Sequence, residues 1–433
     1  MISEWIERRL PELLEEHGVV GAQVAVLHNG EIVDAAAGVR NAVTKEPVTT
    51  DTLFQIGSIT KVWTATLVMQ LVNEGLLDLD RPVRDVLPDF RVADEDAAKV
   101  ITPRQLLCHT AGFEGDLKFE TGSGEDLLEK YVALLADAGQ ATAPGELYSY
   151  CNAGYAVLGR IVEVLRGEPF RDVLRERLVE PLGLRNVAAA RAEYASHEMA
   201  HGHLKGEPTT QHLPESWVAG GSVLAMPARE LLQFVRMHLE TTEFDAMRER
   251  QATHPDFGTG EWWWGLGWEL SNFDGGEVIG HTGMTMGCVA ILRVVPAAGV
   301  AVAVLANSGD DAWPLFSAVL DHVLDELAGL RKRKFPEMPA EPKPVDHAEV
   351  VGNYRCSALD IHITPADGGK VKVRRKGRDP IMATLMSEDE VEYVHLTDDV
   401  LIAVDKSNVL PLGGRDEHGR VGWVHWSRAA MRV

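Results

Sequence analysis

The sequence predicts an α+β fold for residues 1–330 and a small antiparallel β-barrel for residues 345–433. Three observations support this prediction: strand patterns stand at both ends of the first segment, helical patterns fill its middle, and a proline-rich stretch separates it from short alternating segments. The chain has 433 residues, 45% of them hydrophobic, and a net charge of -23. This composition favours a globular protein and argues against nucleic acid or an anionic membrane surface as a partner.

The first segment opens with a helix and two strands. Apolar residues recur near helical spacing between residues 2 and 14, amid charges that argue against a secretory signal. The alternating segments 23–27 and 31–35 flank Asn29 and Gly30, a pair typical of a type I′ hairpin turn. We therefore expect a packed amphipathic helix followed by a β-hairpin.

The middle of the first segment is predicted to be helical, and its end returns to strands. Residues 61–76 have almost no polar face, which predicts a helix buried in the domain centre. Further helices are expected at residues 125–138, 153–166, 171–179 and 228–239. Strands are expected at residues 267–270, 288–295 and 299–305. This order predicts an antiparallel sheet built from both ends of the segment, with the helices packed around it.

A linker and a second domain complete the predicted organisation. Residues 331–344 are charged and rich in proline, as is typical of an exposed, stiff linker. Beyond them, short alternating segments such as 370–374, 391–395 and 421–426 are separated by Gly and Asp turns. This pattern predicts a small antiparallel barrel of the lipocalin-like kind.

The cysteines and the longest apolar runs bear on the compartment. The four cysteines are widely separated and form no C-x-x-C pair, so neither a disulfide framework nor a zinc knuckle is indicated. Apolar stretches such as residues 300–306 are far too short to span a bilayer. We therefore expect a reducing, cytoplasmic location and no membrane partner.

Ser58 and Lys61 form an S-x-x-K pattern at the start of the predicted buried helix. Their spacing places both side chains on one helix face. A serine hydroxyl is a poor nucleophile, but a neighbouring amine whose pKa is lowered by burial can take its proton. Taken alone the pattern is weak, because an N-cap serine followed by a solvated lysine has the same spacing.

Two further motifs follow along the chain. Tyr150 and Asn152 form a Y-x-N on a loop that enters a predicted helix. His281, Thr282 and Gly283 form an H-T-G that leads into a predicted strand. With the three motifs in this order, residues 1–330 resemble the penicillin-recognising S-x-x-K serine enzymes, which include class C β-lactamases, D,D-peptidases, D-aminopeptidases, esterases and acyltransferases. The resemblance implies a β-lactamase/transpeptidase-like fold for this domain.

The resemblance also implies roles for the motif residues. Ser58 would be the nucleophile and Lys61 its partner, while Tyr150 would be the base that passes the proton to the leaving group. For that role we expect the pKa of Tyr150 to be lowered from about 10 by the nearby lysine charge. The backbone N–H groups of Ser58 and of Met284, expected at the start of a strand, would form the oxyanion hole.

The substrate would lie beside Asn152, Thr282 and Gly283, with Asn152 hydrogen-bonded to its carbonyl or amide group. His281 is counted among the catalytic residues. It stands where β-lactamases of this class usually carry lysine, and a histidine there is familiar among the related esterases and peptidases.

Aromatic and cationic side chains are expected around the same pocket. Trp217 and Trp264 would wall it for an apolar acyl or peptide group, although Trp264 also fits a core position. A C-terminal β-domain occurs in the related D-aminopeptidases and in the penicillin-binding-protein-type thioesterases that cyclise nonribosomal peptides. In the latter it helps to form the pocket, and by that resemblance Trp426 and Arg428 would supply an aromatic wall and a cation for a substrate carboxylate.

Two alternatives of other classes stay open at this point. His197, Glu198 and His201 form an H-E-x-x-H pattern, which fits a zinc metallopeptidase. Gly202 and Gly206 would end such a helix at once, and no third ligand stands at a known spacing. The other alternative is a scaffold that has lost activity and serves as a non-catalytic binding module.

We therefore predict a serine hydrolase or acyltransferase that cleaves an ester, thioester or peptide-like amide through an acyl-Ser58 intermediate. A nonribosomal-peptide macrocyclase and a D-amino-acid-specific peptidase are alternatives on the same scaffold. The predicted partner is a small or peptide-like acyl substrate, and the mechanism needs no metal or organic cofactor. The exact substrate, the choice between water and an amine, and the oligomeric state stay open.

Overall fold

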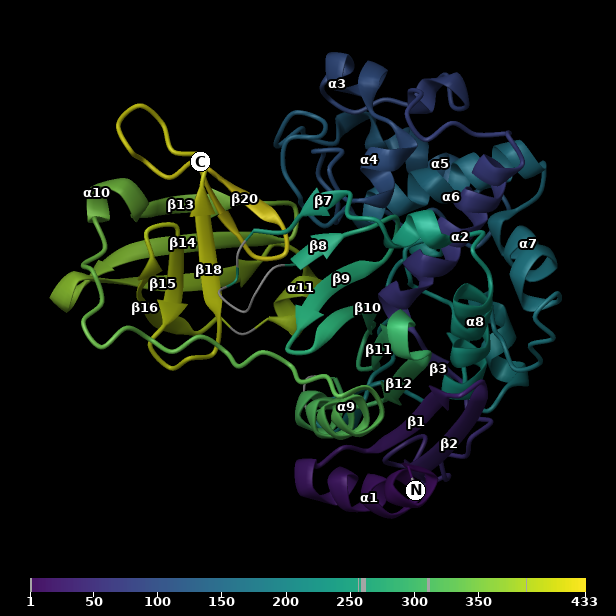
Figure 1. The fold of residues 1–433 in the computed structure, drawn as a ribbon. Coiled ribbons are helices and arrows are strands. Elements are labelled where there is room, and N and C mark those ends of the chain that lie inside the picture. The colour runs from purple at the N-terminus through teal and green to yellow at the C-terminus, as the bar shows by residue number, and fades with distance from the viewer. Residues whose placement is uncertain (1, 256, 258–261, 310–311, 387) are drawn as a thin grey trace.

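The computed structural model describes residues 2–255, 257, 262–309, 312–386 and 388–433. Its two main parts are an eight-stranded antiparallel sheet with helices on both faces and a closed eight-stranded barrel, which stand side by side (Figure 1). The predicted α+β domain and the predicted C-terminal barrel are both confirmed.

The open sheet joins the two ends of the segment 1–330. Its strands run in the order β2-β1-β12-β11-β10-β9-β8-β7. The bounds are β1 Gly21–His28, β2 Glu31–Gly38, β7 Ala252–Thr253, β8 Trp262–Trp264, β9 Glu269–Phe273, β10 Gly276–Met284, β11 Val289–Val295 and β12 Val300–Ala306. β1 pairs with β12, as predicted for a sheet built from both ends of the segment. The hairpin turn has positive φ at Asn29 (52°) and Gly30 (77°), which a type I′ turn requires.

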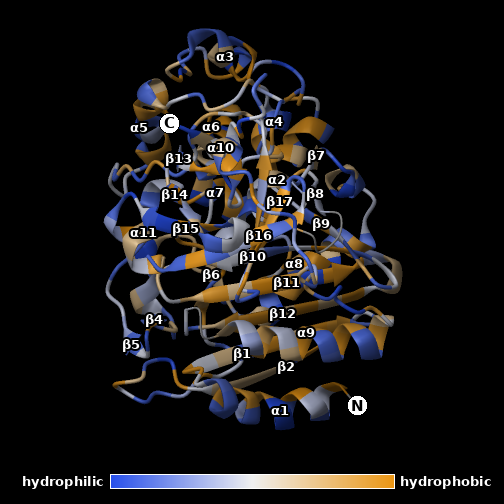
Figure 2. Ribbon diagram, turned by 90° about the vertical axis from the view of Figure 1, so that its left-hand side faces the viewer, coloured by the Kyte–Doolittle hydropathy of each residue, from blue (hydrophilic) through white to orange (hydrophobic). Residues whose placement is uncertain are grey.

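Helices cover both faces of this sheet, α1 and α9 on one face and α8, with α2 behind it, on the other (Figure 2). The bounds are α1 Ile2–His17, α2 Thr60–Asn73, α8 Ala228–Glu240 and α9 Trp313–Ala328. Side chains of a strand alternate between its faces, so Val302 and Val304 of β12 pack toward α9 while Ala303 and Leu305 pack toward α8 and α2. This burial on both sides explains the continuous apolar run in β12.

The remaining helices of this part gather above α2. Their bounds are α3 Glu95–Val100, α4 Pro103–Leu107, α5 Leu127–Leu134, α6 Asn152–Arg166 and α7 Phe170–Leu174. The predicted helix 171–179 divides into α7 and a π-helical turn. α9 and β10 are not among the predicted elements, although Leu315, Val319 and Val323 recur at helical spacing on the buried face of α9. Two short antiparallel pairs are β3 Phe54–Gln55 with β6 Ala225–Met226, and β4 His203–Leu204 with β5 Glu207–Pro208.

The barrel strands follow one another in chain order around a closed cylinder. Their bounds are β13 Gly352–Arg355, β14 Leu359–Ala366, β15 Lys370–Gly377, β16 Glu390–Thr397, β17 Val400–Ala403, β18 Val409–Gly413, β19 Trp423–His425 and β20 Ala429–Arg432. Two short helices accompany them, α10 His347–Val350 before β13 and α11 Pro380–Leu385 between β15 and β16. Of the predicted strand 421–426, the central residues 423–425 form β19. This up-and-down order leaves no open sheet edge.

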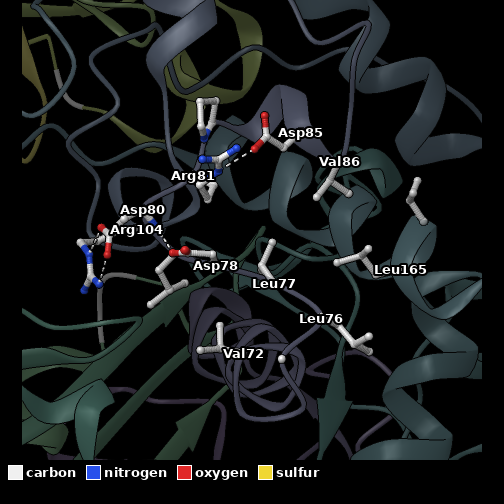
Figure 3. Close-up of a pocket in the computed structure, with 14 residues that line it drawn as sticks. Val72, Leu76, Leu77, Asp78, Asp80, Arg81, Asp85, Val86, Arg104 and Leu165 are labelled. Atoms are coloured by element: carbon white, nitrogen blue, oxygen red, sulfur yellow. Dashed lines mark hydrogen bonds and ion pairs between the residues drawn. The ribbon is translucent and has the colours of Figure 1, made fainter.

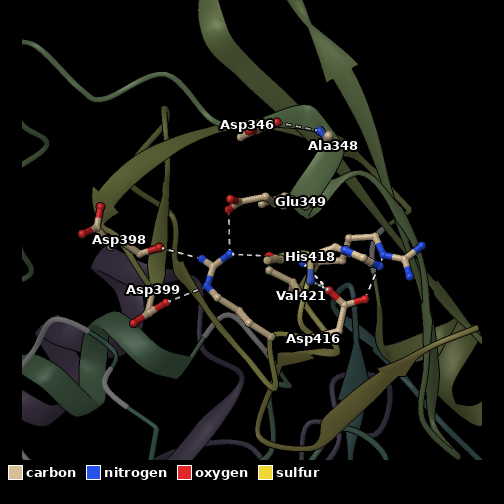
Figure 4. Close-up of polar contacts among 12 residues, drawn as sticks. Asp346, Ala348, Glu349, Asp398, Asp399, Asp416, His418 and Val421 are labelled. Atoms are coloured by element: carbon tan, nitrogen blue, oxygen red, sulfur yellow. Dashed lines mark hydrogen bonds and ion pairs between the residues drawn. The ribbon is translucent and has the colours of Figure 1, made fainter.

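A charged cluster ties together the loops at one end of the barrel (Figure 4). The Arg415 guanidinium lies 2.7 Å from the Glu349 carboxylate on α10 and 3.3 Å from the Asp399 carboxylate between β16 and β17. It also donates to the carbonyl oxygens of Asp398 and Gly419. One planar cation thus joins three loops that are far apart in the sequence.

The segment between the two parts has little regular structure. Residues 332–344 form no helix or strand, and Arg331 makes one bridge to Asp274. Within the described residues, no helix combines the length and the apolar character that crossing a membrane would require.

Candidate active site

A cavity of about 610 Å³ lies between the sheet domain and the barrel. Eleven of the residues singled out in the sequence line it: Ser58, Tyr150, Asn152, Trp217, Trp264, His281, Thr282, Gly283, Met284, Trp426 and Arg428. The barrel contributes further lining from β14, β15, α11 and the turn between β19 and β20. The structure therefore brings together residues from both parts of the chain around one space.

Ser58 lies in a short 3₁₀ turn, Gly57–Ile59, that leads directly into α2. Gly57 has a φ of 53°, and a Cβ placed on it would lie 2.4 Å from the backbone nitrogen of Met284. A Cβ on Gly221 would lie 2.7 Å from the backbone nitrogen of Ser58. Only glycine fits at these two positions, and both let neighbouring backbone close in around the serine.

The Lys61 amine is buried directly beneath Ser58. Its Nζ lies 2.6 Å from Asn152 Oδ1, 2.6 Å from the carbonyl oxygen of Gly220 and 3.3 Å from Ser58 Oγ. Burial, and then the charge of Arg428, hold the pKa of Lys61 well below its ordinary value.

These contacts orient the lone pair of the neutral amine. A neutral lysine has two N–H bonds, and the two shorter contacts are to oxygens that can only accept them. In its neutral form the amine would then direct its lone pair toward Ser58 Oγ. The geometry fits a base that removes the serine proton.

Tyr150 lines the cavity beside Ser58, with Lys61 Nζ 4.8 Å from its ring centre. Burial raises the pKa of Tyr150, against the opposing effects of a hydrogen bond with Ser58 and the charge of Arg428. The prediction of a lowered Tyr150 pKa is therefore wrong. The lysine that was expected to lower it is itself buried and favours its neutral form.

Asn152 is held between Lys61 and a buried carboxylate. Its Nδ2 donates to Asp116 Oδ1 at 2.7 Å, which fixes the amide so that Oδ1 faces Lys61. Arg428 Nε and Nη2 donate to the same carboxylate at 2.7 and 3.1 Å. Burial alone would raise the pKa of Asp116, but Arg428 and the hydrogen bonds hold it below its usual value.

The ion pair with Asp116 bears on the predicted role of Arg428 in substrate binding. The guanidinium lines the cavity, as predicted, but it already binds a carboxylate of its own chain. Its role as the cation for a substrate carboxylate stays a prediction. A chain of contacts runs from Arg428 through Asp116 and Asn152 to Lys61. Nothing in the sequence patterns pointed to Asp116.

His281 lies in β10 with its Nδ1 2.7 Å from the carbonyl oxygen of Thr282. Burial lowers the pKa of His281 to about 3, with a further contribution from Lys61. The ring is therefore neutral at physiological pH, and within the described part of the chain its buried Nε2 has no hydrogen-bond partner. A catalytic role for His281 stays a prediction, in which it would act as a neutral ring.

The H-T-G motif lies inside β10, and Met284 is the last residue of that strand. The expectation that Met284 begins a strand is wrong, because β10 pairs with β11 through the whole motif. The close approach of Gly57 to Met284 still brings the end of β10 against the turn that carries Ser58. The predicted oxyanion hole is compatible with this arrangement and stays a prediction.

The turn between β19 and β20 of the barrel holds the loop that carries Tyr150. Three hydrogen bonds join the two segments: Tyr150 N–H to Ser427 O at 3.0 Å, His425 Nε2 to Tyr148 O at 2.9 Å, and Ala429 N–H to Ser149 Oγ at 3.1 Å. The barrel therefore supports the backbone of the predicted proton donor.

His109 holds the same loop from the sheet domain. The centre of its ring lies 4.3 Å from that of Tyr150, with the two planes tilted by 35°, and its Nδ1 accepts the N–H of Cys151 at 3.0 Å. Its carbonyl oxygen accepts the N–H of Ser149 at 2.9 Å. This positioning role of His109 becomes visible only in three dimensions.

The three predicted wall tryptophans, Trp217, Trp264 and Trp426, all line the cavity, and the first two are buried. Trp264 packs against His109, Tyr150 and His281, so it is part of a core cluster and of the cavity wall. Trp217 donates through Nε1 to Leu117 O at 3.1 Å.

The zinc alternative is wrong. His197 begins an extended stretch after a 3₁₀ helix, so the three H-E-x-x-H side chains do not share a helix face. No group of three or more His, Cys, Asp or Glu side chains among the described residues could hold a metal ion.

A larger hollow of about 770 Å³ lies at the C-terminal end of α2 (Figure 3). Four of its five charged residues form ion pairs with each other, Arg104 with Asp80 at 2.7 Å and Arg81 with Asp85 at 2.9 Å, while Asp78 accepts the N–H of Asp80. None of its lining residues is a serine, cysteine, histidine or tyrosine. It lacks the serine, lysine and tyrosine that meet at the other cavity, so the cavity at Ser58 is the candidate active site.

Comparison with known proteins decides the family. The sequence model of the Beta-lactamase family matches residues 6–318. The chain belongs to the Beta-lactamase family. It is a serine hydrolase of the β-lactamase-like class.

Two curated relatives and one solved structure extend this assignment. Penicillin-binding protein 4 of Amycolatopsis lactamdurans is 42% identical over 376 residues, 81% of this chain and 97% of that protein. Esterase EstB of Burkholderia gladioli is 34% identical over 197 residues, 42% of this chain and 50% of that esterase. The crystal structure of SurE has a TM-score of 0.80 at 28% identity and covers 100% of this chain and 99% of SurE. The similarity to SurE therefore includes the barrel.

Replacing Arg428 should shift the pH dependence of this Beta-lactamase-family enzyme. In Arg428→Gln the cation that lowers the Lys61 pKa is gone, so this pKa rises. Because the neutral amine is the active form, the acidic limb of kcat/KM for a chromogenic ester should move to higher pH. The pH–rate profile checks this, with Arg420→Gln at the far, exposed Asp416 pair as the control. An unshifted limb in Arg428→Gln would contradict the electrostatic role.

Removing the barrel should impair the site more than the fold. A fragment of residues 1–340 keeps both hydrophobic clusters of the sheet domain, so we expect a folded circular dichroism spectrum. It loses the Ser427 contact to Tyr150 and the Arg428 contact to Asp116, so labelling of Ser58 by a fluorophosphonate should slow by about 10²-fold, as for a misplaced catalytic group. Labelling at the rate of the full chain would show that the barrel does not support the site.

Proposed function

We propose that this protein is a serine acyl-enzyme hydrolase or acyltransferase that cleaves an ester, thioester or peptide-like amide through an acyl-Ser58 intermediate. One observation carries the proposal: a buried amine with a lowered pKa lies 3.3 Å from the serine hydroxyl oxygen. A small or peptide-like acyl substrate is the only partner that this reaction needs. The cytoplasmic location stays a prediction.

In the first step Lys61 takes the proton of Ser58 while Oγ attacks the acyl carbon. The oxygen of the attacked carbonyl becomes negative, and the N–H groups of Ser58 and Met284 would stabilise it. Hydrogen bonds aimed at such an oxyanion typically contribute about 10²–10³-fold in rate.

In the second step the tetrahedral intermediate expels the alcohol, thiol or amine. Because its pKa is raised, Tyr150 is a protonated phenol and can donate this proton. The proton held by Lys61 then returns to the phenolate. Water or an amine attacks acyl-Ser58 by the same steps in reverse, which releases the acyl product and restores the serine.

Acyl transfer to an amine is the second candidate. It is favoured by the full-length similarity to SurE, which includes the barrel, and SurE has been crystallised with D-Leu. A peptide macrocyclase or a D-amino-acid-specific peptidase would use the same acyl-enzyme. The ratio of amide to acid product, measured with D-Leu and L-Leu as acceptors, distinguishes transfer from hydrolysis.

Labelling tests the nucleophile directly. We expect intact-protein mass spectrometry to find one fluorophosphonate adduct on the wild type and none on Ser58→Ala, because Ser58 is the serine, among the described residues, that has a buried amine beside it. Ser196→Ala, at an exposed serine, is the matched control and should stay labelled. An adduct that persists in Ser58→Ala, or no adduct on the wild type, would remove the proposal.

Tyr150→Phe should separate acid catalysis from nucleophilic attack. Turnover of an alkyl ester or an anilide should fall by about 10²-fold or more, because the leaving group then lacks its proton donor. A p-nitrophenyl ester should lose much less, because nitrophenolate leaves without a proton. Initial rates for the two substrate types check this, and equal losses on both would argue against the donor role.

A further inference from the structure

Arg375 occupies an inward-facing position of the barrel. Side chains of β15 alternate, and Val371 and Val373, four and two residues before Arg375, are buried in the barrel core. Arg374, its neighbour, faces outward and is exposed. A cation on the interior face of a barrel is costly unless something compensates it.

The charge of Arg375 is stabilised by an aromatic ring and not by a carboxylate. The Arg375 guanidinium stacks over Trp426 at 3.9 Å from the ring centre. Within the described part of the chain it makes no side-chain hydrogen bond or ion pair. Asp405, whose pKa it slightly lowers, is instead bound by the N–H of Ser407 at 2.9 Å.

Arg375 lines the cavity that contains Ser58, and the other lining cations are already paired. Lys118 lies 2.6 Å from Asp379, and Arg428 lies 2.7 Å from Asp116. Arg375 is thus the cation of the cavity wall, among the described residues, that is free to receive an anion.

Next to Arg375 the barrel presents an apolar wall. α11 packs against β15 and lies between the barrel and the open sheet (Figure 1). Four apolar side chains of this helix and of the residue after it line the cavity: Ile381, Met382, Leu385 and Met386. Methionine and leucine side chains adapt to linear apolar groups, so this wall suits an aliphatic chain.

We propose that Arg375 and the α11 wall form a substrate subsite for an aliphatic group that ends in an anionic oxygen group, either a carboxylate or a phosphate. A guanidinium stacked on an aromatic ring can donate two parallel N–H hydrogen bonds to the two oxygens of a carboxylate or phosphate. This inference rests on the proposed function in one respect: the anionic group bound here is part of the substrate that acylates Ser58.

Calorimetric titration of Ser58→Ala tests the subsite without turnover. The probes are hexanoate, hexyl phosphate and the neutral hexanamide, which share a similar apolar body. We expect at least one anion to bind about tenfold or more tightly than hexanamide, the range of a charge-assisted hydrogen-bonded pair. The tighter anion identifies carboxylate or phosphate as the preferred group. Equal affinities for all three would overturn the proposal.

Adding Arg375→Gln should abolish this preference, whereas the outward-facing Arg374→Gln is the matched control and should keep it. If Arg375→Gln proves unstable in a thermal melt, Arg375→Lys serves as the second variant. It retains the positive charge but not the planar pair of N–H donors, so it should give an intermediate preference. A preference that survives Arg375→Gln, or that disappears with Arg428→Gln instead, would overturn the assignment. If Ser58 did not react with the fluorophosphonate, only the acyl-enzyme proposal would be contradicted, because these titrations need no acyl transfer.

Discussion

The site depends on one constraint, which is that an amine with a lowered pKa must be buried beside Ser58. Desolvation disfavours the ammonium form, and two oxygen acceptors satisfy the hydrogens of the neutral amine. One acceptor is the carbonyl oxygen of Gly220. The next residue, Gly221, must be a glycine because it lies against the backbone of Ser58. The other is Asn152, whose orientation in turn needs a carboxylate. The nucleophile, the loop and the helix start are therefore arranged around Lys61.

The same constraint explains why the barrel and the sheet domain share one site. Asp116 fixes Asn152, but a buried carboxylate needs a counter-ion, and that counter-ion is Arg428, 312 residues further along the chain. The turn that carries Arg428 also binds the backbone of Tyr150 through Ser427. Lys61, Asn152 and Tyr150 thus take their geometry partly from the second domain, which makes the barrel a component of the active site.

Sequence patterns could predict what local spacing determines. The S-x-x-K spacing placed Ser58 and Lys61 on one face, strand patterns located five strands of the open sheet and three of the barrel, and Asn29-Gly30 indicated the hairpin turn. The direction of the Tyr150 pKa shift could not be predicted from the sequence, because it depends on burial of the phenol and on the charge of Lys61. The pair of Asp116 and Arg428 was also beyond reach, since no local pattern joins residues so far apart in the chain. The helical H-E-x-x-H pattern failed because the surrounding structure extends that segment.

Charge at two length scales bears on the substrates that this cavity admits. The chain as a whole carries a net charge of -23, which repels an anion at long range and slows its approach. At physiological ionic strength that field is screened beyond about 8 Å, whereas an arginine inside a cavity is screened much less. An anionic substrate would therefore gain little in its association rate and much in its residence time once it reaches Arg375. Selection in this enzyme would then operate through dissociation, after the acyl group has already come within reach of Ser58.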